Sequence, residues 1–249
     1  MKRYGLVGFP LSHSFSKKYF NQKFDKLGLN NTHRYDLFEI EFLKDFPSIW
    51  ERFPDLEGVN VTIPHKVNVK RFLDKLDATV YKVEAVNVVK KIGGQLVGYN
   101  SDYYGFMQSL KNWMAELKTK NVSALVLGSG GASLAVQAAL MDMDIDFEVV
   151  SRFKDKGDYL YTHLIREENI MQENNLIINT TPVGMYPEVN DGPPIPYEQI
   201  NDKHMVYDLI YNPTETYLLK ESQKQGARVK NGLEMLELQA EKSWEIWNS

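Results

Sequence analysis

The chain has 249 residues, of which 43% are hydrophobic and 25% charged, a composition that allows a buried core in one large domain or two smaller ones. The net charge of -4 gives no reason to expect a nucleic-acid surface, and the lack of cysteine excludes disulfides, thiolate nucleophiles and cysteine-bound metals. No apolar run reaches the roughly 20 residues that span a bilayer, and the N-terminal sequence lacks the apolar core of a signal peptide. We therefore expect a cytoplasmic protein, a monomer or homodimer, whose partner is a small molecule and not a nucleic acid or a membrane.

Strand and helix patterns alternate over the first hundred residues. Phe20, Phe24 and Leu27 recur at helical spacing, and Gly28 supplies a stop for that helix. A polar helical segment is expected near 66–82. The expected strands are 3–8, 33–40, 58–64, 85–91 and 95–100, the last two forming a hairpin around a glycine-containing turn.

A long apolar stripe starts at Phe106 and predicts a helix that links two regions of the chain. Beyond it, strands and helices alternate at the spacing of βαβ units, which predicts a parallel sheet. A proline-rich loop is expected at 182–196. The expected strands are 123–128, 146–151, 176–181, 205–211 and 227–232, with helices at 132–141 and 158–171, after residue 211, and at the C-terminus, where Leu233, Leu236, Ala240, Trp244 and Trp247 share one face.

The stretch "LVLGSGGAS" at 125–133 is a glycine-rich turn between a strand and a helix, the context in which such a turn indicates dinucleotide binding. Gly128 permits the tight turn, and Gly130 and Gly131 let backbone N–H groups approach a pyrophosphate at the positive end of the helix. Ser133 stands where the strict pattern has Gly or Ala. The expected pyrophosphate contacts are Gly128, Ser129, Gly130, Gly131 and Ala132.

The end of the next strand bears on the choice of cofactor. An acidic residue there would bind a ribose 2′-OH, whereas this chain has Ser151 and Arg152, followed by Lys154 and Lys156. Arginine can pair with a 2′-phosphate, so NADP is favoured over NAD, and a methyltransferase is disfavoured for the same reason. The alternative is that these cations form the solvated start of a helix.

Eight stretches taken together resemble the shikimate dehydrogenase family, which reduces 3-dehydroshikimate with NADPH in chorismate and aromatic amino acid biosynthesis. They follow the family's order and cover the chain nearly end to end. The chain departs from the family's usual residues at Lys17, Phe20, Glu84, Val88 and Ser101. The stretches are "GFPLSHSFS" (8–16), "NVTIPHK" (60–66), "AVN" (85–87), "GYNSDYYG" (98–105), "GSGGAS" (128–133), "NTTPVGM" (179–185), "DLIYNPTET" (208–216) and "NGLEMLELQA" (231–240).

The resemblance implies a two-domain α/β fold. Residues 1–104 and 233–249 would form a substrate domain completed by the C-terminal helix, and 105–232 an inserted Rossmann-like NADP-binding domain. The expected active site lies in the cleft between these domains.

The resemblance also places Ser14 and Ser16 on the substrate carboxylate, where two hydroxyl donors can hold an anion. The alternative is that both serines only cap the following helix. A polyol substrate needs several neutral donors and acceptors. The residues implied for its ring substituents are Thr62, Asn87 and Gln239, with Tyr211 near the carboxylate.

Lys66 and Asp102 match the family's catalytic pair. Hydride arriving at a carbonyl carbon builds negative charge on the oxygen, so the site needs a proton donor or a cation, and Lys66 can be both. Asp102 can hold Lys66 and bind a substrate hydroxyl; which of the two passes the proton stays open. The alternative is a surface ion pair.

The resemblance implies that the nicotinamide side is lined by a loop at the carboxyl edge of the parallel sheet, where such sheets bind ligands. Met185 could equally pack in the core. The five histidines show no metal-ligand spacing, and we interpret His13 and His65 as structural neighbours of the site. The residues implied for the nicotinamide side are Asn179, Thr180, Val183, Gly184, Met185 and Gly232.

The sequence therefore predicts an NADP-dependent shikimate dehydrogenase without a metal. One alternative is a quinate/shikimate dehydrogenase that also uses NAD. Another is a sensor that binds shikimate-like compounds without turnover, although a sensor would not need Lys66 and Asp102.

Overall fold

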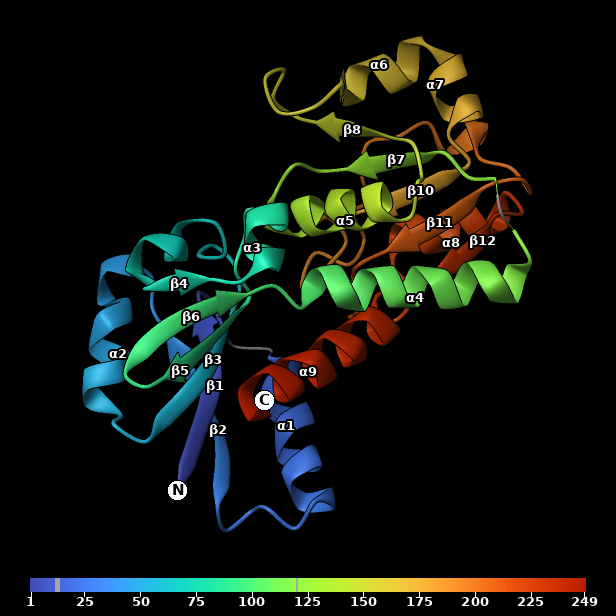
Figure 1. The fold of residues 1–249 in the computed structure, drawn as a ribbon. Coiled ribbons are helices and arrows are strands. Elements are labelled where there is room, and N and C mark those ends of the chain that lie inside the picture. Colours follow the sequence, from blue (N-terminus) through green and yellow to red (C-terminus); the bar gives the residue numbers. More distant parts are fainter. Residues whose placement is uncertain (12–13, 120) are drawn as a thin grey trace. The chain divides into compact units, whose positions relative to one another are not determined.

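The structure is a computed structural model that describes residues 1–11, 14–119 and 121–249. Two compact units make up the chain: Met1–Ser101 with Ala240–Ser249, and Asp102–Gln239. Each unit has a sheet with helices packed beside it, which confirms the predicted two-domain α/β fold (Figure 1). Among the described helices, none is long and apolar enough to cross a membrane.

The first unit contains a mixed sheet with the strand order β2-β1-β3-β5-β6-β4 in the described residues. β1 pairs in parallel with β2 and β3, and β5 pairs antiparallel with β3 and β6, so the expected hairpin is confirmed. Gly93 and Gly94, both at positive φ, form its turn. The elements are β1 (Lys2–Gly8), α1 (Phe15–Lys26), β2 (His33–Glu39), η1 (Leu43–Asp45), α2 (Phe46–Arg52), β3 (Leu56–Val61), η2 (Asn68–Phe72), β4 (Lys75–Leu76), α3 (Ala78–Val83), β5 (Val88–Ile92) and β6 (Gln95–Tyr99).

Two expectations for this unit are wrong. Residues 66–82 do not form one helix but contain η2, β4 and α3. Asp74 accepts a hydrogen bond from a backbone N–H of β6 at 2.7 Å, and Asp77 caps α3 by accepting one from Thr79 N at 2.9 Å. These side chains compete with a continuous helix for backbone groups. Leu27 lies just beyond the end of α1 and is 52% exposed, so it is not part of the apolar face.

Different helices cover the two faces of the first sheet (Figure 1). On one face, Phe46 and Ile49 of α2 pack against β1 and β3. On the other, Phe20 and Phe24 of α1 pack together with Trp247 near the C-terminus. Both faces of this sheet are therefore buried, although β5 pairs antiparallel with β3 and β6.

The end of the C-terminal helix α9 (Leu233–Asn248) packs against the sheet of the first unit, where a glycine leaves space for it. A Cβ added to Gly58 of β3 would lie 2.3 Å from Nε1 of Trp247. That indole nitrogen donates a hydrogen bond to Val89 O at 3.1 Å. Trp247 thus fits against the sheet only because residue 58 has no side chain, and this contact explains why the last residues belong to the first unit.

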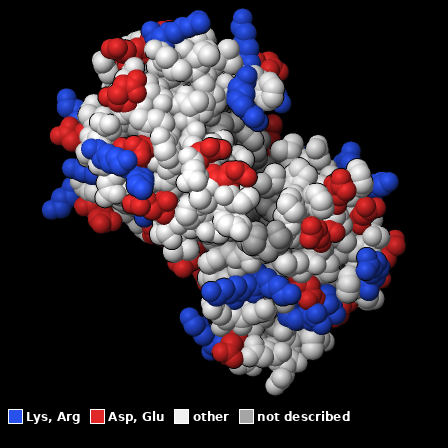
Figure 2. Space-filling model, turned by 180° about the vertical axis from the view of Figure 1, so that it is seen from behind, with Lys and Arg blue, Asp and Glu red and all other residues white. Residues whose placement is uncertain are grey.

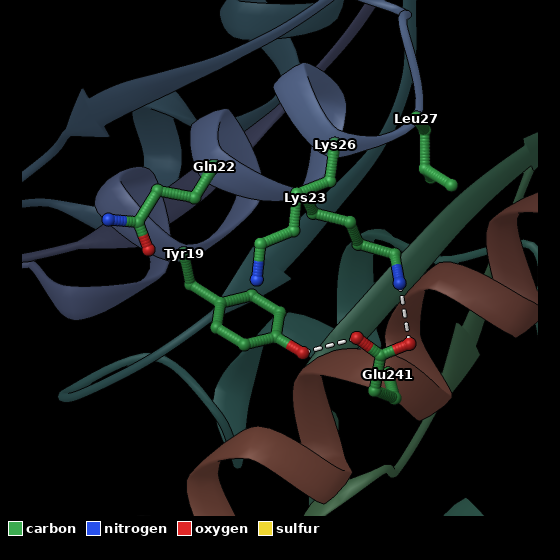
Figure 3. A pocket seen from close by; sticks show the side chains of 6 residues that line it. All are labelled: Tyr19, Gln22, Lys23, Lys26, Leu27 and Glu241. Carbon is green, nitrogen blue, oxygen red and sulfur yellow. Dashed lines mark hydrogen bonds and ion pairs between the residues drawn. The ribbon is translucent and has the colours of Figure 1, made fainter.

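A pocket lies between α1 and α9 (Figure 3). Tyr19 and Lys23 both hydrogen-bond Glu241 there, so its principal polar groups satisfy one another. None of the predicted site residues lines this pocket. Its lining residues are Tyr19, Gln22, Lys23, Lys26, Leu27 and Glu241.

The second unit contains a parallel sheet with the order β12-β11-β10-β7-β8-β9 in the described residues. Counted along the chain from β7, this is the strand order of the Rossmann fold, and the direction of winding reverses between β7 and β10. The elements are α4 (Asp102–Leu117), β7 (Ala124–Leu127), α5 (Gly131–Asp142), β8 (Phe147–Ser151), β9 (Tyr159–Leu160), α6 (Tyr161–Arg166), α7 (Glu168–Glu173), β10 (Leu176–Asn179), η3 (Tyr197–Gln199), β11 (Met205–Asp208), α8 (Tyr217–Lys224), β12 (Arg228–Lys230) and α9.

The helix expected at 158–171 is divided into β9, α6 and α7. Asp158 exchanges hydrogen bonds with the backbone of Val149, donating through its N–H and accepting through its carboxylate, each at 2.8 Å. This pairing draws the residues before Tyr161 onto the sheet edge. The hydrogen bonds to β8 therefore override the local helical pattern.

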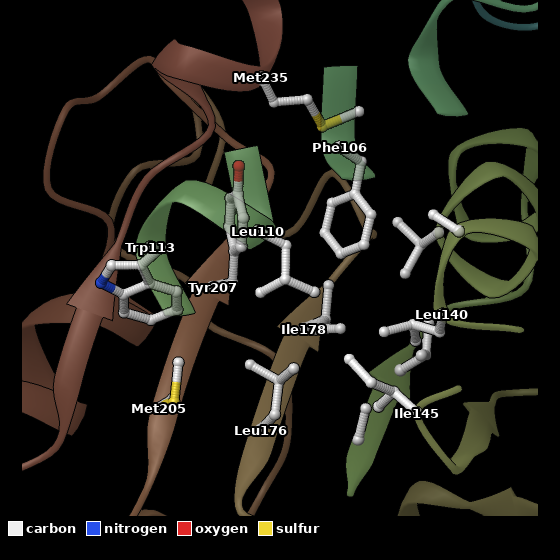
Figure 4. Close-up of a cluster of buried hydrophobic side chains, with 14 of the residues drawn as sticks. Phe106, Leu110, Trp113, Leu140, Ile145, Leu176, Ile178, Met205, Tyr207 and Met235 are labelled. Carbon is white, nitrogen blue, oxygen red and sulfur yellow. The ribbon is translucent and has the colours of Figure 1, made fainter. Parts of the chain in front are cut away.

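Successive residues of the central strands enter two different cores, as expected for a parallel sheet covered on both faces. Phe106, Leu110 and Trp113 of α4 cover one face and pack against Ile178 and Tyr207 (Figure 4). The predicted apolar stripe is thus confirmed as the core face of α4. The other face packs against α6, α7 and α8.

Charged side chains of both signs are interspersed over the face of the molecule seen in Figure 2. On this face no large patch of a single sign is visible.

Candidate active site

The first unit brings two predicted site loops together at the carboxyl ends of β1 and β3. Thr62 N donates a hydrogen bond to Val7 O at 2.8 Å, and Phe9 N donates one to Ile63 O at 3.0 Å. A Cβ added to Gly8 would lie 2.4 Å from Cγ2 of Thr62. Thr62, directly after the end of β3, can approach β1 this closely only because residue 8 is glycine.

Ser14 and Ser16 do not act as helix caps through their side chains. Ser14 occupies the N-cap position of α1 but makes no side-chain cap bond. Its Oγ is buried and has no hydrogen-bond partner in the part of the chain that the structure describes. The Ser16 hydroxyl interacts instead with the phenol of Tyr35: burial raises the pKa of that phenol, and Ser16 lowers it by a smaller amount. The capping alternative is therefore wrong.

A chain of buried polar side chains leads from Tyr35 through the first unit. Tyr35 donates to Asn60 Oδ1 at 2.8 Å, and Asn60 Nδ2 donates to Ser243 Oγ at 2.9 Å. Ser243 Oγ lies 3.1 Å from Ser101 Oγ. Asn87 donates to that Ser101 hydroxyl at 3.0 Å and accepts from Ser101 N at 2.7 Å. Asn87 is thus held in one orientation, and the backbone directly before Asp102 is fixed.

His65 and Lys66 lie in the loop after β3 and have different surroundings. His65 is 4% exposed, and its Nε2 lies 2.8 Å from Ile40 O, which makes it a structural residue. Lys66 is half-buried, and its backbone O accepts a hydrogen bond from Val86 N at 2.8 Å. His13, the other histidine of the predicted site motifs, lies outside the described residues.

Asp102 is the first residue of α4 and of the second unit, whereas Lys66 belongs to the first. Asp102 is only 6% exposed, which contradicts the alternative of a surface ion pair. Two further predicted substrate residues, Tyr211 and Gln239, also belong to the second unit. Gln239 is 9% exposed and donates to Leu236 O at 3.0 Å.

The glycine-rich turn of the second unit lies where the sheet reverses its winding. Gly128 has φ +105°, a conformation that favours glycine, and an added Cβ would lie 2.8 Å from Oγ1 of Thr180. Thr180 N and Oγ1 both donate to Leu127 O, at 2.9 and 2.7 Å. The predicted turn and the predicted "NTTPVGM" loop therefore meet at the carboxyl ends of β7 and β10, where doubly wound sheets bind their ligands.

The space beside this turn is open on the side of helix α5. A Cβ added to Gly130 would have no atom within 4 Å. Gly130 is the N-cap of α5, so free backbone N–H groups follow it. Ser133, in the place of the third glycine, is fully buried and accepts a hydrogen bond from Gln137 Nε2 at 2.9 Å. The turn thus has the free space and donors that a pyrophosphate would use.

Cations follow the end of β8, as the sequence predicts. The hydroxyl of Ser151 lies 3.1 Å from that of Ser129 and accepts from Phe153 N at 3.1 Å, which ties this strand end to the glycine turn. Arg152 and Lys154 are exposed. No helix begins here, because α6 starts only at Tyr161, so the alternative of a solvated helix start is wrong.

The loop after β10 is held by the side chain of Asn179. Its Oδ1 accepts from Thr181 N at 3.0 Å and from Thr181 Oγ1 at 2.7 Å, and Thr181 Oγ1 accepts in turn from Val183 N at 3.3 Å. Met185 is 40% exposed, so the core-packing alternative is wrong. A Cβ added to Gly232 would lie 2.0 Å from Leu209 O, so this glycine permits a close backbone approach.

Comparisons with known proteins agree with this geometry. The family described as the shikimate dehydrogenase substrate binding domain matches residues 6–89. The shikimate dehydrogenase (NADP(+)) of Methanococcus maripaludis is 40% identical over 260 residues, covering 99% of this chain and 91% of the relative. This chain belongs to the shikimate dehydrogenase family. The Geobacillus kaustophilus enzyme of the same name is 37% identical and covers 99% of this chain and 92% of its own length.

Solved shikimate dehydrogenases share the fold over nearly the whole chain. The Thermus thermophilus enzyme in complex with NADP(H) and shikimate matches with a TM-score of 0.85 at 28% identity, covering 99% of this chain and 93% of that chain. The Listeria monocytogenes enzyme in complex with shikimate and NAD matches with a TM-score of 0.83 at 29% identity, covering 100% and 92%.

Two departures from the usual shikimate dehydrogenase residues have a clear structural setting. Glu84 stands where the family often has glycine, and it ends α3 in the left-handed region at φ 60°. Ser101 stands where the family often has threonine, and it is fully buried in the polar chain that contains Asn87.

Sequence reasoning missed three buried polar residues that are hydrogen-bonded to predicted site residues or to their immediate partners. Tyr35 and Ser243 belong to the buried polar chain of the first unit, and Asp208 bonds Asn179 in the second. The register that pairs Asn179 with Asp208 could have found the third, but only with the sheet order known. In the described residues, no group of three or more His, Asp or Glu side chains could hold a metal ion.

Proposed function

We propose that this protein catalyses the NADP-dependent, reversible reduction of 3-dehydroshikimate to shikimate. The observation that carries the proposal is the glycine turn at 128–131, which lies at the reversal point of a Rossmann-ordered sheet and is followed at the end of β8 by Arg152 in place of an acid. The relatives named NADP-dependent shikimate dehydrogenase extend over 99% of the chain and support the same activity.

We assign the two parts of the chain different roles. Residues 1–104 and 233–249 would bind the substrate, and 105–232 would bind NADP. The family match at 6–89 supports the first role, and the strand order of the second sheet supports the second.

The residues of the second unit fit a dinucleotide. Backbone N–H groups at Gly130 and Gly131 would hold the pyrophosphate, because the space beside Gly130 is open. Arg152 and Lys154 would pair with the 2′-phosphate, since both are exposed at the end of β8. The nicotinamide would lie along the loop after β10. The residues proposed for the cofactor are Gly128, Ser129, Gly130, Gly131, Ala132, Ser151, Arg152, Lys154, Asn179, Thr180, Val183, Met185 and Gly232.

The residues of the first unit fit a hydroxylated carboxylate. The buried hydroxyl of Ser14 lacks a partner among the described residues, which suits a donor that awaits an anion. Ser16 would join it by turning its hydroxyl away from Tyr35. The full set proposed for substrate binding is Ser14, Ser16, Thr62, Lys66 and Asn87 of the first unit, with Asp102, Tyr211 and Gln239 of the second.

When bound, NADPH would supply the hydride that reduces the carbonyl carbon. We propose that the ammonium group of Lys66 meets the carbonyl oxygen, where negative charge develops, and donates a hydrogen bond or a proton to it. The carboxylate of Asp102 would hold the Lys66 ammonium and accept a hydrogen bond from a substrate hydroxyl. The buried setting of Asp102 favours such a role over that of a solvated charge.

Two alternatives have distinct predictions. A quinate/shikimate dehydrogenase would also turn over quinate and use NAD, an option to which the NAD complex of the Listeria monocytogenes relative lends weight. A sensor would bind the same ligands without turnover. The test is to mix the purified protein with NADP+ and either shikimate or quinate and to follow NADPH formation. We expect NADPH only with shikimate; equal rates with quinate favour the first alternative, and binding without NADPH formation favours the second.

We further propose a cytoplasmic enzyme that is a monomer or a homodimer. Size-exclusion chromatography with light scattering tests the oligomeric state, and a larger assembly would contradict it.

A further inference from the structure

Asp208 is a buried carboxylate to which the reaction above gives no role. It is the last residue of β11, is 0% exposed, and makes no ion pair in the described part of the chain. A charge buried without a counter-ion is costly unless strong hydrogen bonds compensate it. A carboxylate buried at the carboxyl edge of this sheet, where we propose that NADP binds, therefore requires an explanation.

Three donors converge on this carboxylate. Oδ1 accepts from Asn179 Nδ2 at 2.9 Å and from Ile210 N at 3.0 Å. Oδ2 accepts from Thr216 Oγ1 at 2.6 Å. Hydrogen bonds to a charged acceptor are about twice as strong as neutral ones.

The carboxylate decides the orientation of the Asn179 amide. An ionised carboxylate can only accept, so Asn179 must turn its NH2 group toward Asp208. The amide oxygen then faces the other way, where it accepts from Thr181 N at 3.0 Å and Thr181 Oγ1 at 2.7 Å. With the amide reversed, its NH2 group would face the Thr181 N–H, and the hydrogen bond from that N–H would be lost.

The loop that Asn179 holds also supports the glycine turn. A Cβ added to Gly128 would lie 2.8 Å from Thr180 Oγ1 and 2.9 Å from Thr181 Cγ2. Any displacement of Thr180 and Thr181 would therefore move the surface on which the glycine turn rests.

We propose that Asp208 is a positioning residue for the dinucleotide: its carboxylate fixes Asn179, and Asn179 holds residues 180–183 at the cofactor edge. The inference rests on the proposed NADP site. A purely structural role is the competing explanation, because Asp208 also bonds Thr216, whose hydroxyl caps α8 by accepting from Leu219 N at 3.3 Å.

The test compares dinucleotide affinity in four variants of the full chain, by calorimetric titration with NADP+. Asp208→Asn replaces two charged acceptors with one neutral acceptor and one donor, and we expect it to raise the Kd for NADP+ about tenfold, the equivalent of one lost hydrogen bond. The Kd for shikimate should change less than about twofold. Thr216→Val is the matched control: it removes the Oδ2 partner and the α8 cap, and should lower Tm while leaving the Kd for NADP+ unchanged.

The pathway through Asn179 is tested by a double-mutant cycle. Asn179→Ala should weaken NADP+ binding by itself, and adding Asp208→Asn should cause no further loss. Additive losses, equal losses for shikimate and NADP+, or a loss as large in Thr216→Val would each overturn the inference. If Asp208→Asn does not fold, Asp208→Ser, which has a small hydroxyl in place of the carboxylate, replaces it in the same double-mutant cycle. The expected changes in the Kd for NADP+ are the same.

Turnover of the unmodified protein separates this inference from the proposed function. If the protein binds NADP+ and gives the expected result in the double-mutant cycle but has no activity, only the proposed function is contradicted. Unchanged affinity in Asp208→Asn with normal wild-type turnover ends this inference alone. A wild-type protein without affinity for NADP+ ends both.

Discussion

Tyr35 donates its phenolic hydrogen to Oδ1 of Asn60 at 2.8 Å, deep in the first unit. This bond turns the amide NH2 of Asn60 toward Ser243, which in turn contacts Ser101. The orientation of Asn87, and the backbone before Asp102, therefore depend on a tyrosine at the other end of the chain of bonds.

We expect Tyr35→Phe to lower the free energy of unfolding by about 1–3 kcal/mol, because it leaves the buried Oδ1 of Asn60 without its donor. Urea unfolding measures this. Tyr4→Phe is a matched control: Tyr4 is also buried in the first unit, and its hydroxyl makes no hydrogen bond with the described residues. Equal losses in both variants would mean that the Tyr35 bond is not important for stability.

The glycine turn offers a substitution that separates binding from stability. In Gly130→Ala the new methyl group meets no protein atom within 4 Å, so we expect the free energy of unfolding to fall by no more than about 1 kcal/mol, the effect of a changed helix N-cap. The Kd for NADPH should rise at least tenfold, because the methyl group enters the space proposed for the pyrophosphate. Fluorescence titration checks this, and undiminished NADPH affinity would show that the pyrophosphate lies elsewhere.

Stability should depend on the ionisation of Asp208. Burial, the largest cause, raises its pKa to about 6 from the ordinary 3.8, while bonds from Thr216, Ile210 and Asn179 act in the opposite direction. Between these two values the folded state holds the proton that the unfolded state has lost, so stability decreases as pH rises. Burial, with a smaller contribution from the charge of Asp208, raises the pKa of Tyr197 far above this range, so Tyr197 does not titrate here.

We therefore compare wild type with Asp208→Asn by urea unfolding across this range. As pH rises from about 4 to about 7, the free energy of unfolding of wild type should fall relative to that of Asp208→Asn. The fall should be up to about 3 kcal/mol, which corresponds to roughly two pKa units. A difference that stays constant with pH would show that Asp208 has an ordinary pKa.

Lys66 should act mainly in the transition state. We expect Lys66→Ala to lower kcat by about 10²–10⁴-fold with little change in KM, the range for a lost general acid. Steady-state kinetics with 3-dehydroshikimate measure this, and Lys70→Ala, four residues along the same segment, should leave both constants unchanged. A raised KM with normal kcat would make Lys66 a substrate-holding residue instead.

The sequence predicted the parts of the fold that local patterns encode. The α4 stripe, the β5–β6 hairpin and the glycine turn before α5 are all present, because periodicity and glycine chemistry are readable along a chain. Residues 66–82 and 158–171 were predicted incorrectly. There, Asp74 and Asp158 bond to the backbone of neighbouring strands, and the helical pattern of a single sequence does not reveal such a partner.

Site residues could likewise be predicted only where a local sequence motif contains them. Residues within recognisable motifs, such as Ser14 and Thr180, could be assigned candidate roles from the sequence. Tyr35 and Asp208 could not, because they contact Asn60 and Asn179 rather than a ligand motif, and only the order of strands in each sheet brings the partners together. Glu84 at φ 60° shows the converse: the sequence departs from glycine at a position whose backbone still has the conformation that glycine favours.

The most direct test of the central claim is the reduction of 3-dehydroshikimate by the unmodified protein with NADPH and with NADH. The account predicts that reduced cofactor is consumed and shikimate formed, with kcat/KM at least tenfold higher for NADPH because Arg152 would pair with its 2′-phosphate. If neither cofactor is oxidised although both ligands bind, the protein is not the enzyme proposed; if NADH is preferred, the assignment of Arg152 is wrong.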